Sequence, residues 1–303
     1  MLNCSNLNFS YGKTPALKNI TLAFSPGQTI GLIGSNGSSK STLLNLLGGL
    51  LLWQEGKLYF HNENALANQT TTQDLRIKTG FLMQSFSSDE KITPYDNLLY
   101  TAKIYGIEKS LIPKKIEQTL ELANLQEQAL IQTKKLSIGM RRRLELYRTF
   151  MHEPQLVLLD EPTASLDSKE SQKFFDFLYT YQKKHQSITI IATHKPSEAI
   201  ICDIVIMMHK GQIIAQDSPH KFLEKLDFVN CYASSITNTL PIALQRFDFK
   251  MLKQSNKFHA QLSVDNLANL LQNKQNWQED LQEFSFNKPD LNDVYEHLTQ
   301  IPT

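Results

Sequence analysis

Residues 29–42 read Thr-Ile-Gly-Leu-Ile-Gly-Ser-Asn-Gly-Ser-Ser-Lys-Ser-Thr. The first five, Thr29–Ile33, form an apolar run typical of a strand that is buried on both faces. A loop of small residues follows and leads into a helical pattern; it consists of Gly34, Ser35, Asn36, Gly37, Ser38, Ser39, Lys40, Ser41 and Thr42. In such a loop, successive backbone N–H groups converge on phosphate oxygens, and the start of a helix adds positive potential. The stretch therefore predicts a strand, a phosphate-binding loop and a helix in succession.

Two side chains of this loop have predicted roles in holding a nucleotide. Lys40 would bridge the β- and γ-phosphates, and the Ser41 hydroxyl would bind Mg²⁺. The usual pattern has Gly immediately before the Lys, where this chain has Ser39. If that position requires a left-handed backbone, a residue with a Cβ atom costs roughly 1–2 kcal/mol there. Taken alone, the loop fits a polar strand-to-helix turn as well as it fits a nucleotide site.

Short apolar runs alternate with helical patterns on both sides of this loop. Further buried strands are expected at residues 80–83, 156–159 and 188–192, and a hairpin is expected over residues 204–215. Helices are expected at residues 41–52, 116–130 and 140–151. The alternation predicts an α/β fold in which helices wrap a mostly parallel sheet.

Past Pro219 the sequence becomes rich in Asn and Gln. Strands are expected there near residues 247–252, 258–264 and 281–286, and helices at residues 265–277 and 289–299. We therefore expect two domains, a main domain over residues 1–218 and a small accessory α+β domain over residues 219–303.

Charge and cysteine content exclude several classes of protein. The chain has 31 Lys and Arg residues and 30 Asp and Glu residues, so its net charge is 31 − 30 = +1. No overall electrostatic field attracts nucleic acid, and no nucleic-acid partner is expected. A hydrophobic fraction of 41% excludes a disordered chain. Three widely spaced cysteines favour buried thiols in a reducing, cytosolic compartment. The first residues lack a signal-peptide pattern, and no run approaches the ~18 apolar residues that span a bilayer.

Polar residues follow two of the predicted strands. Asp160 and Glu161 end the apolar run that starts at Leu156, which places Asp160 to hold Mg²⁺ indirectly and Glu161 to polarise an attacking water. His194 follows the strand expected at residues 188–192. The alternatives are a solvated turn for the carboxylate pair and a hydrogen-bonded structural role for His194.

Other motifs lie between and before these strands. Ser137 and Gly139 open a helical pattern and offer a hydroxyl and bare backbone N–H groups to a phosphate. Tyr11 is by default a strand aromatic at a hairpin, and only its position ahead of the first buried strand favours stacking on adenine. The basic run at residues 141–143, with Arg148, lacks interleaved aromatics. We interpret it as the solvated face of a helix and not as a nucleic-acid site.

In their order along the chain, these residues resemble the ATP-binding cassette family, the ATPase subunits of ABC transporters, over residues 1 to about 218. The landmarks are Tyr11 for adenine stacking, residues 34–42 for Walker A, Gln84 for the Q-loop, residues 136–140 for the signature, Asp160 and Glu161 for Walker B, Asp167 for the D-loop and His194 for the switch. The resemblance implies a P-loop NTPase cassette with a central mostly parallel sheet, an antiparallel β subdomain and a helical subdomain at about residues 86–150. It also implies ATP hydrolysis that involves Glu161, His194 and Gln84, and Mg²⁺ held by Ser41, Gln84 and Asp160.

The chain departs from the family pattern at three positions. Ile138 replaces the first Gly of the signature and Met140 replaces its Gln, which is similar to variation in exporter-type cassettes. Ser39 replaces the last Gly of Walker A and bears directly on ATP binding or on the rate of hydrolysis. This replacement leaves open a regulatory or low-turnover cassette that binds ATP.

A single cassette of the resembled family does not complete its own site. Ser137 and Gly139 of one copy contact the γ-phosphate that is held by Lys40 of the other, so the resemblance implies a second cassette as partner, here a homodimer. Separate transmembrane permease subunits would dock near residues 86–100, with Gln84 as the link to the nucleotide. The chain would then be cytoplasmic and peripheral on the inner face of the cell membrane.

The tail narrows the branch of the family. Residues 289–298 read Pro-Asp-Leu-Asn-Asp-Val-Tyr-Glu-His-Leu, and with residues 92–98 they resemble the ATPases of type-2 ABC exporters. That group includes drug-resistance, gliding, polysaccharide and copper-maturation systems. The leading hypothesis is therefore an exporter ATPase whose dimer closure moves separate transmembrane subunits. The alternatives are the regulatory cassette and a soluble cassette that acts in translation or DNA repair.

Overall fold

The computed structural model describes residues 1–52, 54–60, 63–64, 69–237, 239–252 and 256–300. Its central sheet has the strand order β10-β9-β3-β8-β7-β6. The strands are β3 (Thr29–Ile33), β6 (Thr79–Leu82), β7 (Leu156–Asp160), β8 (Ile188–Thr193), β9 (Ile204–His209) and β10 (Gln212–Asp217). All neighbours pair in parallel except β10, which is antiparallel to β9. The predicted α/β class is confirmed, and β3 spans the predicted residues.

A second, antiparallel sheet precedes and follows the phosphate loop in sequence. Its order is β2-β1-β4-β5, with β1 (Leu2–Tyr11), β2 (Thr14–Phe24), β4 (Glu55–Phe60) and β5 (Glu63–Asn64). In β1, buried residues alternate with more exposed ones. The buried side chains belong to the main core; they are Leu2, Cys4, Leu7 and Phe9. This sheet is the antiparallel β subdomain that the resemblance implied.

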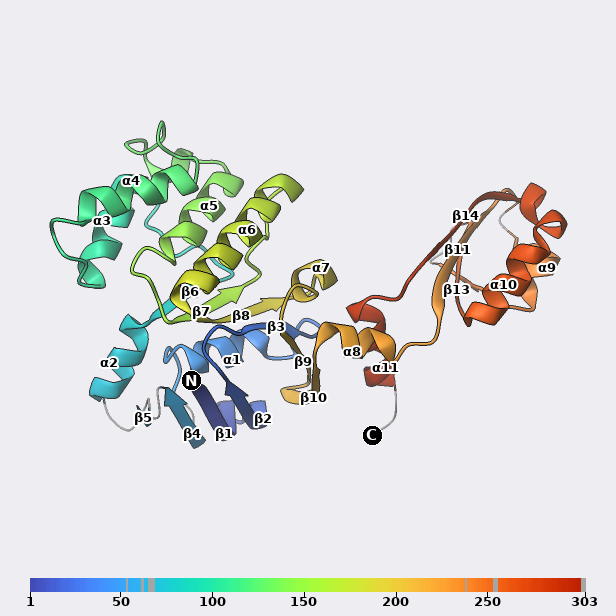
Figure 1. Cartoon of the computed structure of the whole chain (residues 1–303), viewed down its shortest axis with the longest axis horizontal. Helices are drawn as coiled ribbons and strands as arrows, with labels where there is room; N and C mark the ends of the chain where they lie inside the picture. The colour runs from blue at the N-terminus through green and yellow to red at the C-terminus, as the bar shows by residue number, and fades with distance from the viewer. Residues whose placement is uncertain (53, 61–62, 65–68, 238, 253–255, 301–303) are drawn as a thin grey trace. The chain divides into compact units, whose positions relative to one another are not determined.

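Helices cover both faces of the central sheet (Figure 1). α1 (Lys40–Leu47) packs on one face, while α3 (Pro94–Ile104), α4 (Ile112–Leu122), α5 (Ile138–Arg148) and α6 (Ser168–His185) belong to the layer on the other. Strand β7 shows why two layers are needed. Leu156 and Leu158 pack with the α1 core, whereas Val157 and Leu159 pack with the α3–α6 core. Smaller helical elements are α2 (Gln69–Ile77), η1 (Thr133–Lys135) and α7 (Pro196–Ala199).

Several predicted helices end later in the sequence than the helices of the structure do, and α1 and α4 show the physical reasons. α1 ends at Leu47 and not at residue 52, because Gly48 caps it and Gly49 has a φ of 69°. α4 begins at Ile112, with Pro113 in its first turn, and ends by Asn124, whose φ is 52°. Compared with the expected helix at residues 116–130, α4 therefore begins about one turn earlier and ends about two turns earlier.

Residues Pro219–Thr303 form a separate compact unit. Its elements are α8 (Pro219–Glu224), β11 (Val229–Ser235), α9 (Ile242–Gln245), β12 (Lys250–Met251), β13 (Lys257–Leu262), α10 (Val264–Gln272), η2 (Lys274–Asn276), η3 (Gln278–Asp280), β14 (Leu281–Asn287) and α11 (Leu291–Gln300). The antiparallel order β12-β13-β11-β14 and the β-α-β-β-α-β succession make it a split βαβ motif. α8, β11 and α9 were not predicted, and β12 contains only two residues of the strand that was expected at residues 247–252.

The thiols of Cys4, Cys202 and Cys231 are all free and buried, as their spacing predicted. Within the described residues, no helix has both the length and the apolar character needed to traverse a lipid bilayer.

His152, in the loop before β7, is held neutral by its surroundings. Its ring stacks on Tyr105 at 3.6 Å between centroids, and Nε2 lies 3.2 Å from the Thr79 carbonyl oxygen. Burial lowers the pKa of the His152 imidazole from 6.5 to about 4. Between these values the unfolded chain binds the extra proton, so stability falls as the pH falls through this window.

We therefore expect the free energy of unfolding to drop between pH 7 and pH 5 by about 2 kcal/mol more in the wild type than in His152→Gln. The Gln side chain stays neutral while it still offers an N–H donor to the Thr79 carbonyl. Urea denaturation at the two pH values measures the difference. An equal drop in both proteins would show that His152 is not the titrating group.

Candidate nucleotide-binding site

The loop between β3 and α1 is shaped by close contacts of its backbone. A Cβ atom on Gly34 would lie 2.4 Å from the Met208 carbonyl oxygen and 2.4 Å from the Ser38 Oγ atom, so only Gly fits there. Gly37 has a φ of 81°, and the Ser38 N–H donates to the Ser35 carbonyl oxygen at 3.1 Å. The chain therefore forms a tight loop at the carboxyl end of β3, as the sequence predicts.

Ser39 occupies a left-handed position. Its φ is 74° and its ψ is 25°, and as the N-cap of α1 its side chain accepts no capping hydrogen bond. The position before Lys40 therefore does have the left-handed backbone that was considered from the sequence, and this conformation favours Gly. A residue with a Cβ atom costs roughly 1–2 kcal/mol there. This conformational strain is located at the N-cap of α1, the helix that follows the phosphate loop.

Lys40 is buried within the same loop. Its Nζ atom donates to the carbonyl oxygens of Gly34 at 2.7 Å and Ser35 at 3.2 Å. Burial lowers the pKa of the Lys40 ammonium, while the charges of Glu161 and Asp160 oppose that shift. The Lys40 cation therefore interacts electrostatically with the two carboxylates at the end of β7, Asp160 and Glu161.

The Asp160 carboxylate, at the last residue of β7, interacts with the Ser41 side chain. Burial raises the pKa of the Asp160 carboxyl group, and the Ser41 side chain and the charge of Lys40 oppose this rise. A hydroxyl and a carboxylate brought together are hard oxygen donors of the kind that Mg²⁺ prefers. These two residues fit the metal that the sequence assigned to them.

Glu161 and His194 are in direct contact. The His194 Nδ1 atom lies 2.7 Å from Oε1 of Glu161, a separation at which an Nδ1–H group donates a hydrogen bond. The Glu161 N–H donates to the Ala192 carbonyl oxygen at 2.8 Å, which ties the ends of β7 and β8 together. His194 is also largely exposed, with 64% of its side chain accessible. The sequence left open a solvated turn for Glu161 and a structural role for His194, and the structure brings these two side chains into contact.

The signature residues lie at the start of α5. Ser137 is its N-cap and accepts a hydrogen bond from the Met140 N–H at 3.2 Å. A Cβ atom on Gly139 would lie 3.3 Å from the carbonyl oxygen of Ser165, in the D-loop. Asp167 caps α6 by accepting from the Glu170 N–H at 2.8 Å. Within one chain, both Ser137 and Asp167 therefore have a structural role as helix caps.

Tyr11 and Gln84 have exposed side chains. Tyr11 ends β1 with 53% of its surface accessible, and its ring meets Phe9 edge-on at 4.9 Å between centroids. Gln84 follows β6. Neither residue belongs to the phosphate loop itself, and their expected roles in adenine stacking and in the Q-loop stay predictions.

Arg142 corrects the interpretation of the basic run. It is 2% exposed, so it does not lie on a solvated face. Glu145, one turn further along α5, is equally buried and accepts hydrogen bonds from the backbone N–H groups of Ser87 and Ser88. Sequence analysis did not single out Glu145. No local pattern marks Glu145, because its partners Ser87 and Ser88 lie 58 and 57 residues away along the chain.

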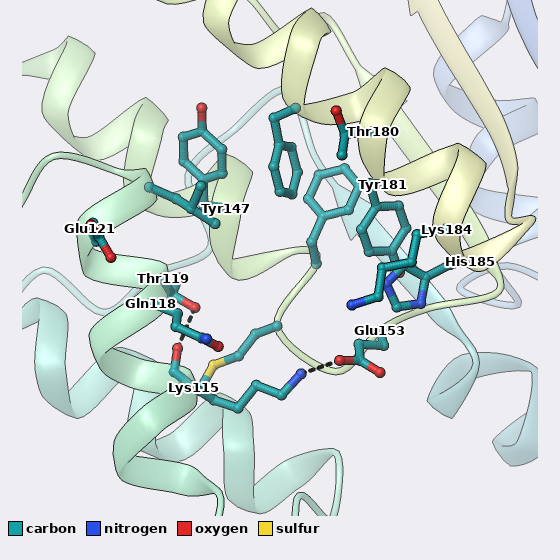
Figure 2. Close-up of a pocket in the computed structure, with 14 residues that line it drawn as sticks. Lys115, Gln118, Thr119, Glu121, Tyr147, Glu153, Thr180, Tyr181, Lys184 and His185 are labelled. Atoms are coloured by element: carbon teal, nitrogen blue, oxygen red, sulfur yellow. Dashed lines mark hydrogen bonds and ion pairs between the residues drawn. The ribbon is translucent and has the colours of Figure 1, made fainter.

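A pocket of about 360 Å³ lies elsewhere, among α4, α5 and α6 (Figure 2). Its walls include the rings of Tyr147 and Tyr181, and the ion pair of Lys115 with Glu153 lies at its rim. None of the residues predicted to bind nucleotide lines it. The pocket is therefore separate from the phosphate loop.

Comparison with known proteins agrees with this geometry. The family described as ABC transporter matches residues 17–164. A putative ABC transporter ATP-binding protein of Mycoplasma genitalium, MG304, is 31% identical over 270 residues, which cover 88% of this chain and 95% of that protein. The methionine import ATP-binding protein MetN of Clostridioides difficile is 31% identical over 71% of this chain and 67% of its own length.

Solved structures show the same fold. A dimeric post-hydrolysis state of the ATP-binding cassette MJ0796, bound to ADP and Pi, matches with a TM-score of 0.67 and 26% identity, over 72% of this chain and 98% of that one. The phosphate loop, the paired carboxylates and these matches lead to one assignment: the chain belongs to the ABC transporter family of ATP-binding proteins, the ABC ATPases.

Proposed function

We propose that this chain binds Mg²⁺ and ATP at the loop of residues 34–42 and hydrolyses the γ-phosphate. The observation that carries the proposal is the meeting of two side-chain pairs, Ser41 with Asp160 and Glu161 with His194, at the carboxyl ends of β7 and β8. Phosphate release with Mg²⁺ and ATP tests it directly. Turnover that survives an excess of EDTA, or that is absent at millimolar ATP, would reject it.

The residues divide the chemistry among them. Lys40 and the loop N–H groups would hold the phosphates, and Ser41 and Asp160 would hold Mg²⁺, which would neutralise charge on the phosphate oxygens. The Glu161 carboxylate accepts a proton from the attacking water, and His194 fixes the orientation of that carboxylate through the 2.7 Å contact. The exposed face of His194 remains available to the γ-phosphate.

The same proposal includes a second cassette. Ser137 is exposed at the start of α5 and can face a nucleotide held by another copy. The dimeric state of the MJ0796 cassette supports a homodimer. In the proposed homodimer, the two copies would share two ATP molecules. ATP binding then favours closure and hydrolysis releases it, so that phosphate chemistry drives a two-state motion.

We further propose that separate transmembrane subunits receive this motion and that the direction of transport is export. The support is the tail at residues 289–298, which resembles that of type-2 exporter ATPases and ends in α11. Relatives named for import and for export both match the chain. Affinity capture from membranes, followed by identification of a polytopic partner, tests the association, and transport in inside-out vesicles with that partner tests the direction.

The left-handed Ser39 favours a second candidate, a cassette with slow turnover. If strain at this residue limits ATP binding, Ser39→Gly should tighten ATP affinity by roughly two- to tenfold, since the relieved strain is partly offset by the flexibility of Gly. Calorimetric titration of ATP measures the change. Asn124→Gly is the matched control, because Asn124 is also left-handed but follows α4. Unchanged affinity in Ser39→Gly would mean that the loop has adapted to Ser.

A further inference from the structure

Arg142 is the largest fully buried side chain of the described residues, and its guanidinium group is satisfied by backbone alone. Nε donates to the Pro162 carbonyl oxygen at 3.1 Å. Nη2 donates to the carbonyl oxygens of Asp160, at 2.8 Å, and Glu161. Nη1 lies 2.8 Å from the carbonyl oxygen of Met83, and 3.5 Å from that of Gln84. One side chain therefore joins the segment after β6 to the segment after β7.

These two segments carry residues of the proposed site. Gln84 is the expected Q-loop residue, while Asp160 and Glu161 are the expected metal-holding and water-activating groups. Arg142 itself sits on α5, five residues after Ser137. The guanidinium thus lies where the signature helix, the Q-loop and the catalytic carboxylates converge, yet it touches these residues only through their backbone.

Stability alone is a weak explanation for this arrangement. Burial lowers the pKa of Arg142, against the charges of Glu145, Asp160, Glu161 and Glu198, so the cation is enclosed at a desolvation cost. Buried charges are often replaceable by apolar side chains of similar volume without loss of stability. The planar fork of Arg, however, holds several carbonyl oxygens in fixed relative positions, which neither an apolar chain nor a single ammonium can do.

We propose that Arg142 is a positioning residue that fixes the backbone of Gln84 relative to that of Glu161. The inference rests on the proposed ATPase function and adds a route within the chain. A shift of the Q-loop, or of α5, reaches the water-activating carboxylate through the Arg142 hydrogen bonds. Arg142 contacts no phosphate in this arrangement, so it affects the rate of the chemical step and leaves nucleotide affinity unchanged.

The test compares Arg142→Gln and Arg142→Lys with Arg143→Gln. Arg143 is the matched control, because it lies on the same helix and donates to the Ala123 carbonyl oxygen, near Glu170, away from both segments. In Arg142→Gln we expect kcat to fall by roughly 100-fold, the size seen when a distant change misplaces a catalytic group. The KM for ATP should stay within about twofold, and Arg142→Lys should recover part of kcat. Arg143→Gln should keep kcat within about twofold.

Hydrogen–deuterium exchange adds a readout that does not depend on turnover. Amides in the peptide that contains Gln84 should exchange faster in Arg142→Gln than in the wild type, and not in Arg143→Gln. If Arg142→Gln fails to fold, Arg142→Lys provides the test. We then expect its kcat to lie below that of the wild type, and the amides near Gln84 to exchange faster than in the wild type.

Three outcomes would overturn the inference. They are an unchanged kcat in Arg142→Gln with an active wild type, a loss confined to KM, and an equal loss of kcat in Arg143→Gln. A wild type without any turnover rejects the proposed function as well, which separates the two failures.

Discussion

Glu161→Gln is expected to lower steady-state ATP turnover by roughly 10²–10⁴-fold, the usual contribution of a general base. The amide keeps the volume of the carboxylate and can still accept a hydrogen bond from His194, but it takes no proton from water. Lys40, Ser41 and Asp160 are unaltered, so ATP binding should persist. In the proposed mechanism hydrolysis releases the closed dimer, so the variant should accumulate as an ATP-bound dimer.

Gel filtration with Mg²⁺ and ATP measures the dimer, and phosphate release measures the turnover. Glu153→Gln is a suitable control, because Glu153 pairs with Lys115 far along the chain from the loop and makes the same change of charge. It should hydrolyse ATP at the wild-type rate and elute as the wild type does. A Glu161→Gln protein that elutes only as monomer at saturating ATP would contradict the shared site.

Gly34→Ala should weaken ATP binding by roughly 10- to 100-fold. The added Cβ atom would lie 2.4 Å from the Met208 carbonyl oxygen and from Ser38 Oγ, and neither atom can retreat without moving β9 or the loop. Overpacking of this kind costs roughly 1–3 kcal/mol. If the loop relieves the clash by leaving its phosphate-binding shape, ATP must restore that shape, and each 1.4 kcal/mol corresponds to about a tenfold loss of affinity.

Gly37→Ala separates steric clash from backbone strain at the same loop. A Cβ atom on Gly37 meets nothing within 4 Å, but its φ of 81° is costly for Ala. This variant should lose affinity by no more than about tenfold, the effect of roughly 1 kcal/mol of strain. Isothermal titration calorimetry with ATP, in the presence of EDTA, compares the ATP affinities of Gly34→Ala and Gly37→Ala. Wild-type affinity in Gly34→Ala would mean that the loop is more pliable than its contacts indicate.

The central sheet was predictable because its strands are apolar on both faces. Leu156 and Leu158 contribute to one core and Val157 and Leu159 to the other, so a continuous run was needed and was visible in the sequence. β11 was not predicted. In Val229–Ser235, polar residues occupy buried positions, and Asn230 is buried through hydrogen bonds to Asp293 and His259. Such partners lie 63 and 29 residues away, so the local pattern does not reveal them.

The carboxylates and His194 were predictable for a similar reason. They follow buried strands, and the carboxyl ends of parallel strands meet at one edge of a sheet. The prediction that Arg142 lies on a solvated helix face was wrong. Its hydrogen-bond acceptors are backbone carbonyl oxygens, which every residue has, so the sequence does not reveal them. Three consecutive Arg residues have the same pattern on an exposed helix. Only the tertiary packing distinguishes the buried one.

The burial of all three cysteines has a practical consequence. Burial raises the pKa of Cys4 to about 12 and that of Cys231 to about 11, and it raises that of Cys202 as well, so few thiolates exist at neutral pH. Maleimide dyes, which attack the thiolate, should therefore label the native protein slowly. A single cysteine introduced at an exposed position such as Lys13 would be the dominant target. Fluorophores attached in this way could follow opening and closing without a cysteine-free background.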